Sequence, residues 1–298
     1  MSVLTLKEIL ATAQKNNFAV GSFAPRNLCL IGMIMDAAQD EYSPVIVQIS
    51  SVELTWAGVD CERFAERFYS LAGRYTVPIC LHLDHTFDME VIRSAVASRF
   101  TSVMIDASQY PFDENVKRTK EAADYAHAYG VSVEAELGRL RSYDKFETED
   151  DALLYTVPEE AALFADQTGA DALAISIGTA HGVYPVANPK IDFERLGQIR
   201  SMVKIPLVLH GGSGLPNETV HKAATFPGGG VSKINIATDL ELAFLKALGH
   251  SGRLSEDEYG RRFDGETLRK AGQAVKKAVR DKISGNIFST GTAKYYGA

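Results

Sequence analysis

The segment Pro78-Ile-Cys-Leu-His-Leu-Asp-His85 joins a short apolar run to two histidines and an aspartate. Two more runs of the same kind lead to a histidine, Ile175-Ser-Ile-Gly-Thr-Ala-His181 and Pro206-Leu-Val-Leu-His210. Apolar runs of this length, bounded by glycine or proline, are typical of buried parallel strands. The pattern therefore predicts strands whose carboxyl ends carry polar side chains.

Runs of this type recur along the whole chain, and each is followed by a segment long enough for a helix. Eight such units with no linker between them predict one domain, residues 1–298, folded as an α/β (β/α)8 TIM barrel with its site at the carboxyl ends of the strands. An open doubly wound sheet is the alternative. The eight predicted strands are residues Phe18–Ala24, Val45–Ser50, Pro78–Leu83, Ser102–Ile105, Val131–Leu137, Ala172–Ile177, Pro206–His210 and Lys233–Ile236.

Extra helices are expected after the eighth strand. Residues 237–249 read as its helix, 251–265 as a helical excursion with a loop, and 266–283 as an amphipathic helix. We expect the glycine-rich tail, residues 284–298, to pack on a partner or to stay mobile.

The composition limits the class of protein. The net charge is −7 and no basic stripe is present, which argues against a nucleic-acid partner. Hydrophobic residues make up 46% of the chain, yet no run approaches the length of a membrane span and no signal segment is evident. Three cysteines without a CxxC spacing argue against a disulfide framework. We expect a cytoplasmic protein with no membrane partner.

Three histidines are candidate metal ligands. His85, His181 and His210 follow the third, sixth and seventh predicted strands. A lone histidine at a strand end usually only makes a hydrogen bond, but barrel strand ends converge on one rim. Three imidazoles with one open position are a common ligand set for catalytic zinc. Their joint placement predicts a zinc site.

Carboxylates accompany these histidines. Because side chains alternate along a strand, Asp84 and His85 cannot both face inward unless the strand bends between them. Asp106, Glu134 and Glu136 lie near the ends of the fourth and fifth strands. They either serve a second metal position or orient a histidine ligand, and ion pairing with a nearby arginine is the alternative.

Two glycine-rich or helix-opening turns are candidate phosphate sites. The segment His210-Gly-Gly-Ser-Gly214 can present successive N–H groups to an anion. The segment Asn235-Ile-Ala-Thr-Asp239 opens a helix, whose amino-terminus favours phosphate. Loops after strands seven and eight are the usual phosphate site of such barrels.

The chain resembles the class II, metal-dependent ketose-bisphosphate aldolases, which act on fructose and tagatose bisphosphates. The resemblance covers nearly the whole sequence. It is carried by six motifs in order: HLDH (82–85), SVMIDAS (102–108), VEAELG (133–138), IGTAHGVY (177–184), VLHGGSGL (208–215) and KINIATD (233–239).

This resemblance implies a lyase that cleaves a ketose phosphate or bisphosphate reversibly to dihydroxyacetone phosphate and an aldehyde. It implies a homodimer or homotetramer and one catalytic zinc, with an alternative position for a second divalent or monovalent cation. The implied residues are His85, His181 and His210 for zinc, Asp106 and Glu134 near the alternative position, Asp84 as acid/base at the C4 hydroxyl, Asp144 as a second base, Gly182, Gly211, Ser213, Thr238 and Asp239 for the phosphate, Asn235 near the reacting carbons, and Ser50 on the far side of the substrate.

Four departures from the family pattern concern the substrate. Phe23-Ala-Pro-Arg-Asn27 stands where relatives read Phe-Asn-x-Asn-Asn, and Pro185 replaces an expected lysine. The loop 141–145 lacks paired glycines, and Glu266 stands near the position of an arginine that grips the distal phosphate. We expect altered specificity at the distal end. Arg26 either meets a carboxylate or sulfonate of the substrate or pairs with a carboxylate of the protein.

Other functions remain as alternatives. A Schiff-base aldolase would use Lys233. A non-catalytic accessory barrel would keep the fold without turnover, although the retention of Asp84 and three histidines argues against it. A zinc-dependent epimerase or hydrolase on this scaffold would form product without releasing dihydroxyacetone phosphate.

Overall fold

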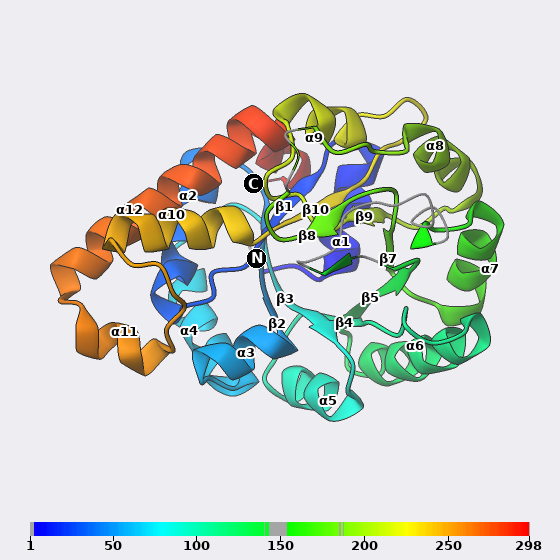
Figure 1. Ribbon diagram of the computed structural model, residues 1–298. Helices are drawn as coiled ribbons and strands as arrows, with labels where there is room; N and C mark the ends of the chain where they lie inside the picture. Colours follow the sequence, from blue (N-terminus) through cyan, green and yellow to red (C-terminus); the bar gives the residue numbers. More distant parts are fainter. Residues whose placement is uncertain (1–2, 140, 143–153, 185, 187, 298) are drawn as a thin grey trace.

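Parallel strands form a closed barrel at the centre of the computed structural model, which describes residues 3–297 except 140, 143–153, 185 and 187. Around the barrel the strand order is β1-β10-β9-β7-β5-β4-β3-β2, and every pairing is parallel (Figure 1). The barrel strands are β1 (Val20–Phe23), β2 (Val45–Ser50), β3 (Ile79–Thr86), β4 (Ser102–Ile105), β5 (Ser132–Leu137), β7 (Ala172–Ile175), β9 (Leu207–Leu209) and β10 (Lys233–Ile236).

All eight predicted strands are confirmed, as is the barrel. The open sheet is wrong because β1 pairs with both β2 and β10, which closes the sheet on itself. Two short strands, β6 (Arg141–Ser142) and β8 (Ala180–His181), form a separate parallel pair in the loops that follow β5 and β7.

Helices surround the barrel (Figure 1). Within the described part of the chain, none of them is both long and apolar enough to cross a membrane. They are α1 (Leu6–Lys15), α2 (Ile31–Asp40), α3 (Ser51–Ala57), α4 (Cys61–Ala72), α5 (Met89–Ala97), α6 (Phe112–His127), α7 (Pro158–Thr168), α8 (Phe193–Met202), α9 (Asn217–Ala224), α10 (Thr238–Leu248), α11 (Glu256–Arg262) and α12 (Gly265–Lys282).

Helix α1 packs against the apolar lower half of the barrel interior. It starts with a capping box between Thr5 and Glu8. Its buried face joins a hydrophobic cluster of inward-facing strand residues. The cluster comprises Leu6, Ile9, Leu10, Ala13 and Phe18 with Val20, Ile46, Cys80, Met104, Ala172, Ala174 and Val208. Substrate therefore has to approach from the other end, where the strands terminate.

The inward-facing residues become polar toward the carboxyl ends of the strands. Along β2, for example, Ile46 is followed inward by Gln48 and Ser50, and along β3 Cys80 is followed by His82 and Asp84. Buried polar groups are stable only when they are paired. This polar upper half is where the candidate site lies.

The predicted C-terminal helices are confirmed as α10, α11 and α12. The tail instead packs on its own chain, through a π-helical turn (Ile283–Ile287) and a 3-10 turn (Thr292–Tyr296). Ser289 Oγ lies 2.9 Å from Ser43 Oγ, and the Tyr296 hydroxyl donates to the carbonyl of Ile9 at 2.7 Å. The tail therefore holds α1 in place.

Candidate active site

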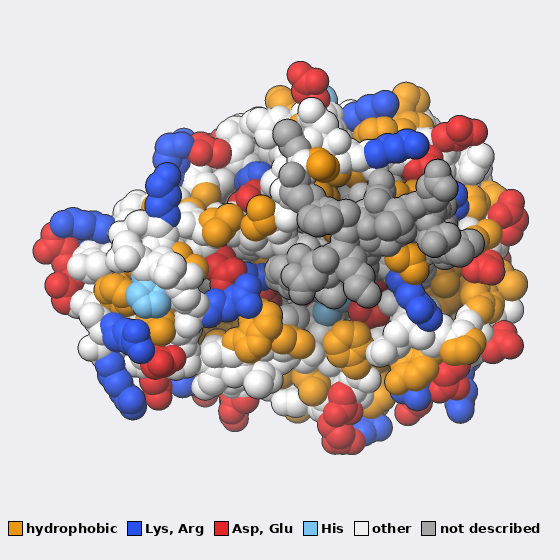
Figure 2. All heavy atoms as spheres, in the orientation of Figure 1, with side chains coloured by type: hydrophobic (Ala, Val, Ile, Leu, Met, Phe, Trp, Pro, Cys, Tyr) orange, Lys and Arg blue, Asp and Glu red, His pale blue; other side chains and the backbone are white. Residues whose placement is uncertain are grey.

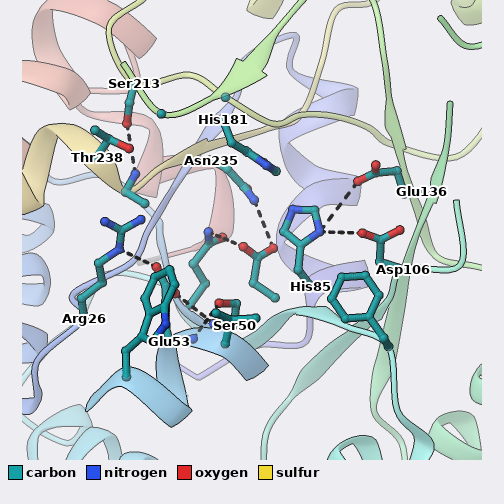
Figure 3. Close-up of a pocket in the computed structure, with 18 of the residues that line it drawn as sticks. Arg26, Ser50, Glu53, His85, Asp106, Glu136, His181, Ser213, Asn235 and Thr238 are labelled. Atoms are coloured by element: carbon teal, nitrogen blue, oxygen red, sulfur yellow. Dashed lines mark hydrogen bonds and ion pairs between the residues drawn. The ribbon is translucent and has the colours of Figure 1, made fainter. Parts of the chain in front are cut away.

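A cavity opens at the carboxyl ends of the barrel strands (Figure 3). Strands β2, β3 and β10 and the loops after β1, β4, β7 and β9 contribute to its wall. Most of the predicted site residues line it. They are Arg26, Ser50, Asp84, His85, Asp106, His181, Gly182, Gly211, Ser213, Asn235 and Thr238.

A bulge in β3 brings two consecutive side chains into the site. The pairing of β3 with β4 shifts register between Leu83 and Thr86, and His85 has a φ of 22°. A positive φ is unfavourable for a residue other than glycine and has to be held by its surroundings. The shift lets Asp84 and His85 share the cavity, which regular alternation forbids.

The three predicted histidines meet at the cavity, which His85 and His181 line, while His210 is fully buried beside them. The ring centroid of His85 lies 4.9 Å from that of His181 and 4.5 Å from that of His210. The centroids of His181 and His210 are 5.8 Å apart. One nitrogen from each ring lies within 4.8 Å of the others. This spacing suits a shared metal ion with an open position for substrate.

In two of the three histidines, one ring nitrogen is held by a carboxylate. His85 Nδ1 lies 3.0 Å from Asp106 Oδ2, and His210 Nε2 lies 2.8 Å from Glu134 Oε1. Such pairing fixes the tautomer of a histidine ligand and turns its other nitrogen toward the metal. Those other nitrogens, His85 Nε2 and His210 Nδ1, are buried without a hydrogen-bond partner among the described residues. The residues present therefore fit a zinc ion.

Glu136, predicted either to serve a second metal position or to orient a histidine ligand, lies close to two of the histidines. Its Oε2 lies 3.5 Å from His210 Nδ1 and 3.9 Å from His85 Nδ1. With His85 and Asp106 it forms a second group that could hold a cation. Asp106 and Glu136 therefore lie together beside His85, while Glu134 lies against His210. In the sequence, the only signal for Glu136 was that it lies two residues after Glu134 and so faces the same side of the strand.

The protonation of the histidines reflects this crowding. Burial, with His85 and His210 nearby, lowers the pKa of His181 to about 3. Burial also opposes charge on His85, but Asp84, Asp106 and Glu136 outweigh it and raise the pKa of His85 to about 10. Without metal, His85 is thus an imidazolium whose Nε2 proton has no partner among the described residues.

Zinc binding is therefore expected to release a proton from His85, since a metal ligand must be a neutral imidazole. Between pH 6.5 and pH 8.5 the apparent zinc affinity should rise about tenfold per pH unit for each proton released. Titration calorimetry in two buffers of different ionisation enthalpy measures the protons directly. A zinc affinity that is flat over this interval would contradict the expectation.

Asp84 lines the same cavity as His85 and His181, and two amides hold its carboxylate. Gln48 Nε2 donates to Asp84 Oδ2 at 2.9 Å, and Asn235 Nδ2 donates to Oδ1 at 3.1 Å. Burial raises the pKa of Asp84, but His85, His82 and Lys233 outweigh burial and hold it well below the usual range. Asp84 is thus an oriented carboxylate that can accept a proton from substrate.

Lys233 neutralises the carboxylates beneath the site. Its fully buried Nζ lies 2.8 Å from Glu134 Oε2, 3.4 Å from His82 Nε2 and 3.9 Å from Asp84 Oδ1. His82 Nδ1 is 2.9 Å from Ser102 Oγ. The ammonium group of Lys233 therefore already neutralises the carboxylates of the group formed by His82, Asp84 and Glu134. A metal ion is not needed at that position.

Replacing Lys233 with methionine is expected to destabilise the protein by about 3–5 kcal/mol, because Glu134 would remain buried without its ion-pair partner. Chemical denaturation measures the change. Lys270→Met is the matched control, since Lys270 pairs with Glu266 at the surface, where both side chains are about two-thirds exposed. It should change stability by less than about 1 kcal/mol. The double variant Lys233→Met, Glu134→Gln should recover part of the lost stability. If it recovers none, Lys233 does not act by neutralising Glu134.

One end of the cavity, termed the α10 end, is formed by Gly182, Gly211, Ser213 and Thr238 at the start of α10. Ser213 Oγ accepts hydrogen bonds from the N–H groups of Ala237 and Asp239. At Gly211, with a φ of 68°, a Cβ atom would come within 2.3 Å of a backbone oxygen, so only glycine fits. The helix start and the glycine turn favour a phosphate here.

Asp239 lies outside this lining. Its Oδ2 accepts from the Gly214 N–H at 3.1 Å and pairs with Lys282 Nζ at 2.5 Å. Its side chain braces the glycine turn against α12, and its N–H donates to Ser213 Oγ at 3.3 Å. Its contact with a phosphate stays a prediction.

Arg26 meets carboxylates of its own chain. Its Nε pairs with Glu53 Oε1 at 2.6 Å (Figure 3), and its Nη1 pairs with Glu241. Of the other departures, Glu266 is exposed at the start of α12 and pairs with Lys270. Asp144 and Pro185 lie outside the described residues.

The sequence interpretation missed further residues of the wall. Gln48 lies two residues before Ser50 on β2 and faces inward like it, so the alternation of side chains along the strand could have identified it. Val52, Glu53 and Trp56 belong to α3 and Phe87 follows β3, and no local signal marks them as lining a cavity.

The comparisons with known proteins agree with this geometry. The family model described as "Fructose-bisphosphate aldolase class-II" matches residues 4–292. The YdjI aldolase from Escherichia coli K12 is 33% identical, with a TM-score of 0.82 over 98% of this chain and 99% of that one. The fructose-bisphosphate aldolase of Campylobacter jejuni is 25% identical, with a TM-score of 0.78 over 97% of both chains.

Proposed function

This chain belongs to the class-II fructose-bisphosphate aldolase family, and we propose that it is a zinc-dependent aldolase. The reaction is the reversible retro-aldol cleavage of a ketose phosphate to dihydroxyacetone phosphate and an aldehyde. The observation that carries the proposal is the convergence of three histidine nitrogens within 4.8 Å beside the Asp84 carboxylate.

Zinc would be held by His85, His181 and His210, and when bound it supplies Lewis-acid polarisation of the C2 carbonyl of the ketose. Asp84 accepts the proton of the C4 hydroxyl as the C3–C4 bond breaks. C4 then becomes the aldehyde carbon, and the electron pair of the broken bond stays with the three-carbon half. Asp144 is the proposed donor that returns a proton to C3.

The remaining residues position the substrate. The phosphate of the three-carbon half is assigned to the α10 end, through Gly182, Gly211, Ser213 and Thr238, with Asp239 bracing the turn. Asn235 contributes twice, because its amide orients Asp84 at 3.1 Å and it also lines the cavity beside the reacting carbons.

A Schiff-base mechanism through Lys233 has less support. The amine of Lys233 is fully buried, lies 2.8 Å from Glu134 and is absent from the described cavity lining. A Schiff-base lysine has to reach the substrate carbonyl as a neutral amine. The ion pair with Glu134 keeps the amine charged and holds it away from the cavity, so it opposes both the neutral state and the reach to the carbonyl.

The test is release of dihydroxyacetone phosphate from a panel of ketose 1-phosphates and 1,6-bisphosphates, measured with a coupled dehydrogenase. We expect release that a chelator stops and added zinc restores. Release that survives the chelator, together with borohydride trapping of substrate on the protein, would favour the Schiff-base mechanism. Product formation without dihydroxyacetone phosphate would favour an epimerase or hydrolase.

We also propose a cytoplasmic homodimer or homotetramer that uses small phosphorylated sugars and binds neither nucleic acid nor membranes. The family resemblance and the acidic net charge of −7 support this. Light scattering coupled to size-exclusion chromatography measures the subunit number.

A further inference from the structure

The cavity has a second end, termed the α3 end, which is lined by Arg26, Val52, Glu53, Trp56 and Phe87. Under the proposed function, the α10 end takes the phosphate and the histidines take the reacting carbons. The α3 end is then the space left for the aldehyde half of the substrate. Its chemistry decides which aldehydes fit.

Positive charge at the α3 end is already neutralised. Arg26 is the one lysine or arginine among the described residues that line the cavity. Its guanidinium pairs with Glu53 and Glu241, and Glu241 also pairs with Arg253, whose Nη2 lies 2.9 Å from Glu241 Oε2. Two guanidinium groups and two carboxylates sum to zero charge. From these four described side chains a second phosphate would meet no net positive charge, and it would lie near two carboxylates.

A capping box at the start of α3 occupies two of its amide groups. Glu53 Oε2 accepts from the Ser50 N–H at 3.0 Å, and Ser50 Oγ accepts from the Glu53 N–H at 3.2 Å. This capping box uses two of the amide groups that could otherwise bind an anion, and it fixes a carboxylate beside them. Within this capping box, the Ser50 hydroxyl proton is the one donor left for a ligand oxygen.

The rest of the α3 end is apolar although it faces solvent. Val52, Trp56 and Phe87 are 42%, 41% and 48% exposed. Hydrophobic side chains lie over α3 on the face shown in Figure 2, beside basic ones. Exposed apolar groups in a cavity wall are typical of a surface that contacts a ligand. They match the C–H groups of a carbon chain better than they match a phosphate.

We infer that the α3 end receives an uncharged hydroxylated chain. The substrates are then ketose 1-phosphates whose aldehyde half carries neither a second phosphate nor a carboxylate. This inference rests on the proposed aldolase function and narrows its substrate class. Arg26 has a positioning role within it, because its ion pair holds Glu53 at the cavity wall.

Aldol synthesis with the zinc-loaded full chain tests the inference. Consumption of dihydroxyacetone phosphate is measured with three aldehydes of equal length: glyceraldehyde, glyceraldehyde 3-phosphate and tartronate semialdehyde. We expect kcat/KM to be about tenfold or more higher for glyceraldehyde than for either anion. Equal or faster reaction with an anionic aldehyde would overturn the inference and leave the aldolase intact. No consumption with any aldehyde would overturn the aldolase proposal itself, and the inference with it.

A charge variant gives a second test. Glu241→Gln removes one of the two carboxylates that neutralise Arg26 and Arg253, without altering the cavity lining. It should raise kcat/KM for glyceraldehyde 3-phosphate about tenfold and leave that for glyceraldehyde unchanged. Glu266→Gln makes the same charge change at an exposed position on α12 and should alter neither. If Glu241→Gln folds normally and gains nothing with the phosphorylated aldehyde, the electrostatic argument is wrong.

Discussion

Replacing His181 with alanine is expected to lower kcat about a thousandfold or more, because loss of zinc removes several kcal/mol of transition-state stabilisation. His181 is the most suitable of the three histidines for this test. His85 and His210 each hold a buried carboxylate, Asp106 and Glu134, at 3.0 and 2.8 Å, so their removal would also disturb the fold. The low pKa of His181, about 3, means that burial keeps it neutral at every working pH.

The measurements for His181→Ala are zinc content after dialysis, the rate of dihydroxyacetone-phosphate release, and thermal unfolding. His127→Ala is the matched control, since His127 lies on α6 and pairs with Asp171, which also binds Lys7 and the Val133 N–H. We expect the control to keep both zinc and activity. A His181→Ala protein that retains stoichiometric zinc and normal turnover would remove the basis for the metal site.

Replacing Asp84 with asparagine is expected to lower kcat for cleavage about 10²–10⁴-fold, the usual contribution of a positioned general base. The substitution nearly preserves size, and Gln48 and Asn235 can rotate their amides to pair with the new side chain. Zinc content should therefore stay unchanged. The loss should appear in kcat rather than in KM, because the proton is transferred only as the C3–C4 bond breaks.

Proton exchange separates this role from a merely structural one. Under the proposed mechanism, exchange of the C3 proton of dihydroxyacetone phosphate with solvent deuterium does not involve the C4 hydroxyl. Asp84→Asn should retain this exchange, observed by NMR, while cleavage falls. Equal loss of exchange and cleavage at full zinc occupancy would mean that Asp84 holds the site together and does not move the proton.

The strands of the barrel were predictable because their signal is local. Each of β7 and β9, for instance, is a run of apolar residues typical of a buried parallel strand. The convergence of His85, His181 and His210 also followed, because parallel barrel strands all end on the same rim. Neither inference needs the exact register between strands.

The details of the site depend on that register. Alternation along β3 could show only that Asp84 and His85 conflict, and the register shift against β4 resolves the conflict. Parity could show that Glu134 and Glu136 face inward, but not that Glu134 meets His210 and Lys233 while Glu136 approaches Asp106. Cross-strand distances of 3 to 4 Å are set by barrel closure, which involves residues far apart in the chain.

Arg26 shows the same division. The sequence by itself determined the barrel, the histidine rim, the inward carboxylates and the glycine turn at Gly211, because each follows from spacing within one segment or from the general geometry of parallel barrels. Only the tertiary structure decided that Arg26 pairs with Glu53 and Glu241, which are separated from it by 27 and 215 residues. Charge balance in a cavity is a sum over such distant neighbours, so the chemistry of the α3 end emerges only when the chain is folded.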